Sequence, residues 1–392
     1  MDNDLTVTVL PYRSTASGMT TYSDYLIKAL LKARVDVRVV GFGSGPEFLN
    51  ESDVPFYGLG EDPHKLDYLG GPMITYAWIR RRLSKFTTES ALKGGIFHFI
   101  YPGANFVSPK EAFPTVVTAW GYSSKFEILS KSPLDFSLFK YPVVVLGKLE
   151  HYYLDFHSYR KANLVIGTTS ETIKFWSQKI KTFRGRYVPL PVEINSTFCA
   201  QSNENKNVVS FLIAERDLER PRNNVWRVLE AFRLLFNKGF TNFNIYLVGG
   251  FGLRLKTMVE ALKSLGVMIS LYNYLPKSAF FDLLAKSDVS IVPRYIMDQG
   301  AYWPLEAMAF GCCIIASDLP AFRDFVIHGV NGLLVDPFSV TDIVNKVQIL
   351  LEDNNILVSL RNGAISHVAR THSLAIVGKQ LARLYSKVLD EG

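Results

Sequence analysis

The sequence has few cysteines and no long apolar run. Its only cysteines are Cys199, Cys312 and Cys313, and the adjacent pair lies in an apolar segment, a spacing that suits neither a disulfide framework nor a zinc site. We expect a buried strand in a reducing compartment there. No stretch of about 18 uncharged apolar residues occurs, which argues against a transmembrane helix. Residues 1–14 lack a basic region followed by an apolar one, so no secretory signal is expected.

The chain contains fewer acidic than basic residues. The chain has 43 Lys and Arg against 36 Asp and Glu, a net charge of +7, which suits an anionic ligand such as a nucleoside diphosphate or an acidic membrane surface. The basic residues are scattered and form no recognisable nucleic-acid-binding module, so nucleic acid is not expected as a partner. We expect a cytoplasmic protein, with peripheral attachment to the cytoplasmic face of the membrane as an alternative.

Short apolar runs alternate with amphipathic stretches of helical length through most of the chain. In the expected helix at 18–33, for example, apolar residues between Tyr22 and Leu30 share one face. Alternating strands and helices predict right-handed crossovers and parallel sheets. Strands are expected at 5–10, 35–40, 96–100, 115–119, 164–167, 208–213, 244–248, 289–292 and 313–316, and helices at 18–33, 223–237, 253–265, 277–286 and 302–310.

The alternation restarts after 188–198, a turn-like segment that contains Pro189 and Pro191. A chain of 392 residues is long for one hydrophobic core and sufficient for two. We therefore predict an α/β protein with two doubly wound, Rossmann-like domains, at 1–190 and 191–370. A last helix within 371–392 is expected to cross back to the first domain.

Segment 130–160 does not follow the alternation. It is rich in aromatic residues and contains Lys131, Lys140 and Lys148. One interpretation is an inserted helix pair that packs on the first domain. The alternative is an interfacial patch that contacts a bilayer and is attracted to it by these lysines.

Parallel sheets of this kind bind ligands beyond the carboxyl ends of their strands, so the residues that follow each strand are candidates. Gly18 follows the first strand at a helix start, where free N–H groups attract an anion. A capped helix after a flexible loop is an equal alternative. The stretch Leu247–Gly252 runs from a strand into glycines, which allows a backbone to approach a ligand.

Three arginines, Arg216, Arg220 and Arg222, follow the first strand of the second half. Guanidinium groups at this point can stabilise the charge that develops on a leaving diphosphate. The alternative is a solvated charged loop, which is the usual role of such a run.

The strongest candidate is the segment 298–311, which also follows an expected strand. Pro304 suits the first turn of a helix and Gly311 suits its end. Asp298 in the loop and Glu306 early in the helix would then border one pocket, with helix N–H groups between them. Carboxylates accept hydrogen bonds from sugar hydroxyls, and amides bind phosphate oxygens. Each acid alone could instead cap or begin the helix.

These motifs together resemble those of the retaining GT-B glycosyltransferases, specifically glycosyltransferase family 4. That family carries E-x-F-G-x-x-x-L-E-A-M-A-x-G-x-P-V-I-A, and the matching stretch here is Asp298 to Ala316, which ends Leu-Glu-Ala-Met-Ala-Phe-Gly-Cys-Cys-Ile-Ile-Ala. Further likeness lies at Glu215–Asn223, Asn163–Glu171, Ser317–Val326 and Gly329–Val335. The resemblance covers most of the chain, is strong from about 207 to 340, and implies two domains that face each other across a cleft.

The resemblance implies transfer of a sugar from a nucleotide-diphosphate donor, with retention of configuration, to a glycan, lipid-linked or small-molecule acceptor. As catalytic residues, Arg216 and Arg222 would neutralise the leaving diphosphate and Asp298 would hold the donor sugar. The donor-binding residues would be Glu306 at the ribose, Leu275 near the base, and Gly18, Gly300, Ala301, Tyr302 and Trp303 near the phosphates. The acceptor-binding residues would be His98 and Trp120, with a purely structural role for His98 as an equal alternative.

Three positions depart from the family pattern. Asp298 is one methylene shorter than the family's Glu, Arg222 replaces a usual Lys, and Trp120 stands where the family often has His. The shorter Asp298 would change the position of the donor sugar. Arg222 would keep the charge with a different geometry, and at Trp120 the contact made by His would be lost or replaced by stacking.

No Asp-x-Asp follows an expected strand, so neither a metal ion nor another cofactor is expected. Arginines and helix amides would then supply the electrostatic stabilisation, in a front-face reaction without a covalent nucleophile. Two other functions fit the same fold: a nucleotide-sugar epimerase, and a catalytically silent subunit that binds a partner.

Overall fold

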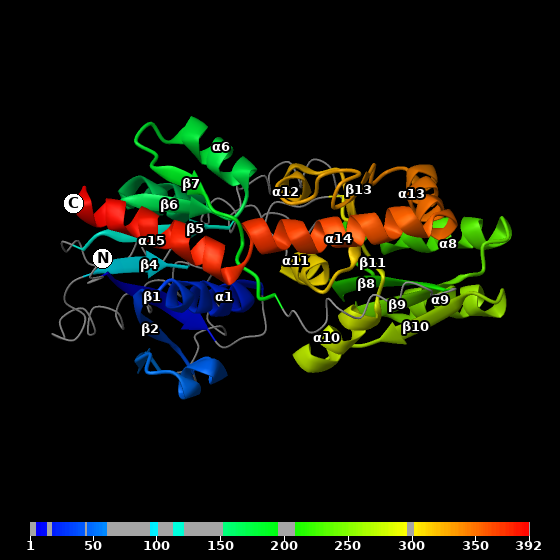
Figure 1. Cartoon of the computed structure of the whole chain (residues 1–392), viewed down its shortest axis with the longest axis horizontal. Helices are drawn as coiled ribbons and strands as arrows, with labels where there is room; N and C mark the ends of the chain where they lie inside the picture. The colour runs from blue at the N-terminus through cyan, green and yellow to red at the C-terminus, as the bar shows by residue number, and fades with distance from the viewer. Residues whose placement is uncertain are drawn as a thin grey trace, which may run out of the picture. The chain divides into compact units, whose positions relative to one another are not determined.

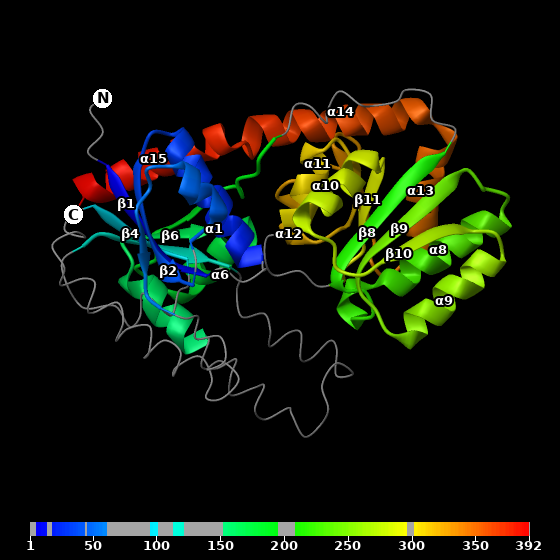
Figure 2. The ribbon, with the colours of Figure 1, turned by 90° about the horizontal axis from the view of Figure 1, so that it is seen from below.

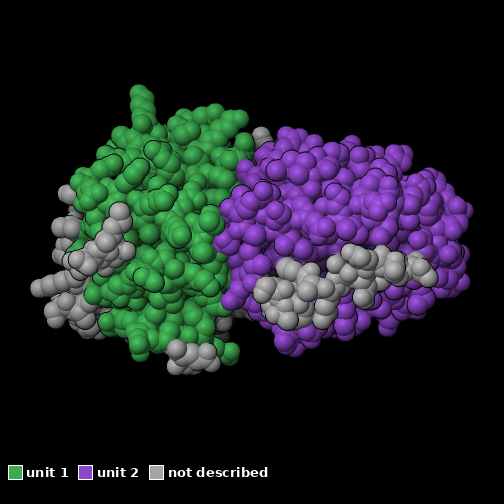
Figure 3. Space-filling view, in the orientation of Figure 1, with its two compact units in different colours: residues 1–191, 298–300, 374–392 green, residues 192–297, 301–373 purple. Residues whose placement is uncertain are grey.

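The computed structural model describes residues 5–13, 18–43, 45–60, 95–100, 113–120, 152–194, 208–295 and 302–391. These residues form two compact units (Figure 3). Unit 1 holds the described residues up to Pro191 and those from Leu374 onward. Unit 2 holds the described residues from Val192 to Ser373.

Unit 1 is built on a seven-stranded parallel sheet with the order β3-β2-β1-β4-β5-β6-β7 (Figure 1). The chain passes outward from β1 in one direction and then in the other, as in a Rossmann fold. Its elements are β1 (Thr6–Arg13), α1 (Gly18–Lys32), β2 (Asp36–Phe42), η1 (Glu47–Glu51), β3 (Phe56–Gly58), β4 (Ile96–Phe99), β5 (Thr115–Ala119), β6 (Leu164–Gly167), α6 (Ser170–Lys179) and β7 (Gly185–Tyr187).

The last helix of the chain, α15 (Leu374–Asp390), packs against α1 in unit 1. The two helix backbones approach closely at Gly378, where a Cβ atom would lie 2.0 Å from the carbonyl oxygen of Ala29. Only a glycine permits this approach. Unit 1 therefore includes both ends of the described chain.

Unit 2 is built on a six-stranded parallel sheet with the order β10-β9-β8-β11-β12-β13. Its strands are β8 (Val209–Asp217), β9 (Phe243–Gly250), β10 (Met268–Tyr272), β11 (Val289–Val292), β12 (Cys313–Ser317) and β13 (Gly332–Val335). Its helices are η5 (Pro221–Asn223), α8 (Val225–Asn237), α9 (Leu253–Ser264), α10 (Lys277–Lys286), α11 (Tyr302–Ala309), α12 (Pro320–Arg323), α13 (Val340–Glu352) and α14 (Asn354–Thr371).

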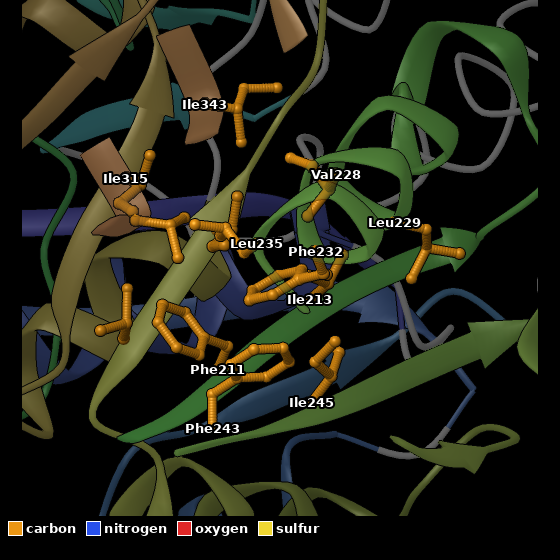
Figure 4. Packing of buried hydrophobic residues seen from close by; sticks show 14 of the residues in the cluster. Phe211, Ile213, Val228, Leu229, Phe232, Leu235, Phe243, Ile245, Ile315 and Ile343 are labelled. Atoms are coloured by element: carbon orange, nitrogen blue, oxygen red, sulfur yellow. The ribbon is translucent and has the colours of Figure 1, made fainter. Parts of the chain in front are cut away.

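Both faces of the unit 2 sheet are covered by helices. Along β8, Phe211 and Ile213 pack in a core with α8, α9 and α13, whereas Leu212 packs on the other face with α10 and α11. Figure 2 shows α8 and α9 on one side of the strands and α10 and α11 on the other. In the first core, the ring centroids of Phe211 and Phe232 are 5.0 Å apart (Figure 4). Burial on both faces explains why the strands are continuous apolar runs.

The predicted α/β fold with two Rossmann-like sheets is confirmed. Strands β5, β6 and β11 and helix α10 have the bounds expected from the sequence. The sequence interpretation missed the edge strands of both sheets, which are β3 and β7 in unit 1 and β10 and β13 in unit 2. It also ended β8 at 213, four residues before its observed end at Asp217. These four residues matter because they include Arg216, the first predicted site residue of unit 2.

The described part of segment 130–160 begins at Tyr152, and the expected residues 130–151 lie outside the described chain. Residues 152–161 are helical. Tyr152 and Tyr159 pack on the fully buried Trp176 of α6, with ring centroids 5.4 and 4.9 Å from it. This part therefore packs on the unit 1 core. No helix in the described ranges is long and apolar enough to cross a membrane.

The predicted buried strand at the adjacent cysteines is confirmed. Cys312 and Cys313 are both fully buried and carry free thiols, and Cys313 begins β12. Burial raises the pKa of the Cys313 thiol, so the thiol stays protonated.

Candidate functional site

The candidate site of unit 2 lies where the direction of the sheet order reverses. Strands β8 and β11 are neighbours in the middle of the sheet, and the chain continues from them toward opposite edges. In open parallel sheets, ligands bind beyond the carboxyl ends of the strands at such a switch point. The residues there are Glu215, Arg216 and Asp217 at the end of β8, and Pro293, Arg294 and Tyr295 after β11.

The structure brings the predicted arginines to this edge. Arg216 is the penultimate residue of β8 and Arg222 lies in η5, and both are exposed. Asn223 holds the loop between them, because its side-chain amide donates a hydrogen bond to the carbonyl of Asp217 (2.6 Å). The N–H of Tyr295 in turn donates to the carbonyl of Arg222 (3.1 Å). The segment from Arg216 to Arg222, called the arginine loop below, is therefore held by hydrogen bonds near both of its ends.

Asn224 is a second anchor, and the sequence interpretation missed it. Its backbone is left-handed (φ 59°), a conformation that asparagine tolerates better than most residues. Its buried side-chain amide donates to the carbonyls of Pro293 (2.8 Å) and Pro337 (2.7 Å). It thereby fastens the start of α8 to the loops that follow β11 and β13.

Glu215 and Arg294 form a bidentate ion pair at the switch point, which the sequence interpretation also missed. The Nε and Nη2 atoms of Arg294 lie 2.6 and 2.5 Å from the two carboxylate oxygens of Glu215. The Glu215 side chain is 1% exposed and the Arg294 side chain 24%. Two signals for this pair were present in the sequence: a glutamate near the end of an apolar strand, and an arginine shortly after the end of another.

The two glycines that end β9, Gly249 and Gly250, lie close to the protein's own backbone. A Cβ atom at Gly249 (φ 141°) would lie 1.7 Å from the carbonyl oxygen of Glu215. One at Gly250 would lie 3.1 Å from the Tyr274 hydroxyl and 3.2 Å from the carbonyl oxygen of Arg216. The close approach of this backbone to a ligand stays a prediction; in the structure the two glycines lie near Glu215, Arg216, Leu218 and Tyr274.

Helix α11 carries the next group of predicted residues. Glu306 is buried (6% exposed), as is Tyr302, at the first position of the helix. The indole nitrogen of Trp303 is buried and has no hydrogen-bond partner among the described residues. The predicted Asp298, Gly300 and Ala301 lie outside the described residues.

Leu275 lies in the loop between β10 and α10. It packs against the apolar core on the α10 and α11 side of the sheet and is partly buried. The start of this loop lies at the same edge as Arg216, because the Tyr274 hydroxyl donates a hydrogen bond to the Arg216 carbonyl (2.6 Å). The structure thus brings Leu275 to the edge that carries the arginine loop.

Two of the residues predicted in unit 1, Gly18 and Trp120, lie at the carboxyl edge of its sheet. Gly18 begins α1, directly after the connection from β1. Trp120 follows β5, donates its indole N–H to the carbonyl of Ile100 (2.7 Å), and makes an edge contact with Tyr22 (4.8 Å between centroids). Gly18 and Trp120 therefore share one edge of the sheet.

His98 is enclosed in the unit 1 core. Its Nε2 lies 2.7 Å from the Thr118 hydroxyl and its Nδ1 lies 2.6 Å from the Tyr385 hydroxyl of α15, and the residue is 0% exposed. Burial lowers the pKa of His98 to about 3, so the ring is neutral. Of the two roles considered for His98, the geometry is that of the structural one: it links β4 and β5 to the C-terminal helix, and neither ring nitrogen reaches a surface.

The fold defines the class of protein to which this chain is similar. Sucrose-phosphate synthase from Thermosynechococcus elongatus has the same two-domain architecture, with a TM-score of 0.74 and 16% identity over 99% of this chain and 100% of that one. The Anabaena protein HepE, solved in complex with UDP-glucose, matches with a TM-score of 0.69 and 16% identity over 98% and 100%. The fold is the two-domain, Rossmann-like α/β fold of the GT-B glycosyltransferases.

The sequence of unit 2 is similar to that of a known family. Residues 199–367 match the family described as Glycosyl transferases group 1, so the chain carries a glycosyl transferase group 1 domain. A 115-residue segment is 30% identical to D-inositol 3-phosphate glycosyltransferase of Thermobispora bispora, and it covers 29% of this chain and 26% of that protein. The chain thus matches about a quarter of this curated relative's length.

Proposed function

We propose that this protein is a glycosyltransferase that takes a sugar from a nucleotide-diphosphate donor bound by unit 2. The observation that carries the proposal is the pair of exposed arginines, Arg216 and Arg222, on an anchored loop at the switch point of a group 1 domain. Guanidinium groups bind diphosphate oxygens with paired hydrogen bonds and keep their charge at any physiological pH.

In this proposal the diphosphate leaves toward Arg216 and Arg222, which stabilise the charge that develops as the glycosidic bond breaks. Glu306, buried in α11, accepts hydrogen bonds from the ribose hydroxyls. The N-terminal amides of α11, from Gly300 and Ala301 to Tyr302 and Trp303, bind the phosphates. Leu275 borders the base.

Asp298 holds the hydroxyls of the donor sugar in the same proposal. Gly18 and Trp120, in unit 1, are assigned to a phosphate and to the acceptor respectively. We leave His98 out of this set because both of its ring nitrogens are hydrogen-bonded inside unit 1.

Transfer proceeds with retention of configuration and needs no metal ion. The arginine loop and helix amides supply positive charge in place of a metal, and a donor phosphate oxygen accepts the proton of the acceptor hydroxyl on the same face. The acceptor is a glycan, a lipid-linked sugar or a small molecule. An inverted product anomer would contradict this mechanism.

The donor site is tested by thermal unfolding of the protein with UDP, GDP, ADP or dTDP, each with EDTA. A nucleotide at about one hundred times its dissociation constant stabilises the folded state by roughly 2.7 kcal/mol. We expect one nucleotide to raise the Tm despite EDTA, and Arg216→Ala to abolish the shift. The matched control is Arg233→Ala, on α8, where Arg233 pairs with Glu230 on the surface. Equal shifts in both variants would overturn the assignment of Arg216.

A further inference from the structure

Arg216 lies in an irregular part of β8. Ala214 pairs with Val248 and Asp217 with Gly250, so the register shifts between these points and two residues, Glu215 and Arg216, face one residue of β9. A bulge of this kind interrupts the regular ladder of hydrogen bonds and re-aims the side chains that it carries. The regular pairing of β8 with β9 therefore does not fix the direction of the Arg216 side chain.

Other contacts hold the backbone at this bulge. The Tyr274 hydroxyl donates to the Arg216 carbonyl (2.6 Å), and Gly249 packs against the Glu215 carbonyl oxygen. The carboxylate of Glu215 is bound on both oxygens by Arg294, which follows β11 on the opposite side of β8. The residue before Arg216 is thus fixed through both its carbonyl and its side chain.

Burial of this ion pair has a physical cost. Desolvation of two charged groups offsets much of their attraction, so a buried pair contributes little net stability compared with apolar side chains of the same size. A bidentate guanidinium–carboxylate pair does, however, fix relative orientation closely. Its place at the switch point makes that orientation useful for a neighbouring ligand-binding group.

We propose that Glu215, Arg294 and Tyr274 are positioning residues that orient Arg216 for the diphosphate of the donor. The proposal rests on the proposed function, because it concerns the same site. Arg294 also keeps the Glu215 carboxylate engaged, so that this negative charge does not pair with Arg216.

The variant Glu215→Gln separates positioning from simple electrostatics. It removes a negative charge beside the site, so electrostatics alone predicts tighter binding of an anion. Loss of positioning predicts weaker binding, by roughly tenfold, the equivalent of about 1.4 kcal/mol. The variant Arg294→Lys keeps the charge and loses the bidentate geometry, and we expect it to weaken binding as well.

The unit 2 sheet offers a matched control at its other end. Asp288, just before β11, forms a buried ion pair with Arg361 of α14 (3.0 Å), with side chains 4% and 13% exposed. Asp288→Asn makes the same chemical change as Glu215→Gln, away from the carboxyl ends of the strands. We expect it to leave nucleotide affinity unchanged.

The experiment is calorimetric titration of the full chain with whichever of UDP, GDP, ADP and dTDP binds the wild-type protein most tightly. We expect Kd to rise roughly tenfold in Glu215→Gln and Arg294→Lys, and the double variant Glu215→Gln/Arg294→Gln to bind no more weakly than the weaker single variant. Tyr274→Phe, which removes one hydroxyl from an exposed side chain, should raise Kd about threefold.

The outcomes separate the two proposals. If the wild-type protein binds none of the four nucleotides, both fall. If it binds and Arg216→Ala weakens binding, but Glu215→Gln and Tyr274→Phe bind as well as wild type or better, the positioning role is wrong and the proposed donor site stands. Tyr274→Phe keeps the test decisive should Glu215→Gln fail to fold.

Discussion

In the described part of unit 2, one carboxylate–guanidinium pair is buried at the amino ends of the strands and another at their carboxyl ends. The two pairs differ in the other groups that they contact. At the amino ends of the strands, Asp288 also accepts the N–H of Ser210 (2.9 Å), and Arg361 also donates to the carbonyl of Gly311 (2.7 Å). That pair therefore ties α14 to the starts of β8, β11 and β12. The Glu215–Arg294 pair at the carboxyl ends instead lies beside a bulge.

This difference separates two uses of a buried ion pair. The Asp288 pair joins α14 to the starts of regular strands and also hydrogen-bonds backbone groups there. Its loss therefore leaves buried charge and unpaired N–H groups. The Glu215 pair fixes a stretch that the ladder of the sheet does not hold, next to the exposed Arg216. The first should govern stability and the second should govern ligand affinity.

The largest expected effect is on folding stability at the amino ends of the strands. Asp288→Asn should lower the free energy of unfolding by about 3 kcal/mol, because it leaves the Arg361 charge buried without its partner. Urea unfolding of unliganded protein measures this loss. A loss below about 1 kcal/mol would mean that the pair behaves like a surface ion pair, and the comparison would fail.

The second effect concerns direct ligand contact at the carboxyl ends. Arg216→Ala should lower turnover of the sugar nucleotide by about 100-fold, the usual effect of removing one group that stabilises a developing negative charge. Unfolding of the free protein should change little, since Arg216 is exposed. The same substitution at Arg233 serves as the control, and similar turnover in the two variants would contradict the role of Arg216.

The third effect concerns unit 1, where the buried His98 is hydrogen-bonded to two hydroxyl groups instead of a charged partner. Burial lowers the pKa of His98 to about 3, whereas an unfolded histidine titrates near its ordinary value of 6.5. The unfolded chain therefore takes up a proton that the folded chain does not, and stability falls as the pH falls from 6.5 toward 3, by about 1.4 kcal/mol per pH unit.

His98→Gln should remove this part of the pH dependence, measured by urea unfolding between pH 6.5 and 4.5. His328→Gln, at an exposed histidine, is the control and should keep the slope. Retention of the full slope in His98→Gln would show that other groups cause it.

The central strands of the two sheets could be predicted from the sequence. The ion pairs between side chains at the ends of these strands could not. Strand β11 is a fully buried four-residue run and was predicted with its observed bounds. Strand β10, in contrast, exposes its first residue and only partly buries its last three, although most of its residues are apolar. A short apolar run cannot be assigned to a strand by periodicity alone, and an edge strand has a neighbouring strand on one side only.

The same limit applies to the candidate site. The strand order alone brings Arg216 and Arg222 to the ligand edge, because Arg216 lies at the carboxyl end of the first strand of the domain and Arg222 follows that strand. The pairing of Glu215 with Arg294 joins residues 79 positions apart, and no local pattern encodes which acid meets which base. The bulge that makes this pairing useful depends on backbone register, which side-chain periodicity does not reveal.

The most direct test of the account is to follow sugar nucleotides by NMR with the purified protein in the presence of EDTA and a panel of glycan and lipid-linked acceptors. The account predicts that one donor is consumed, that its nucleoside diphosphate is released, and that the new glycosidic bond keeps the donor's anomeric configuration, while Arg216→Ala is about 100-fold slower. Consumption at the same rate by Arg216→Ala, or an inverted product, would contradict it.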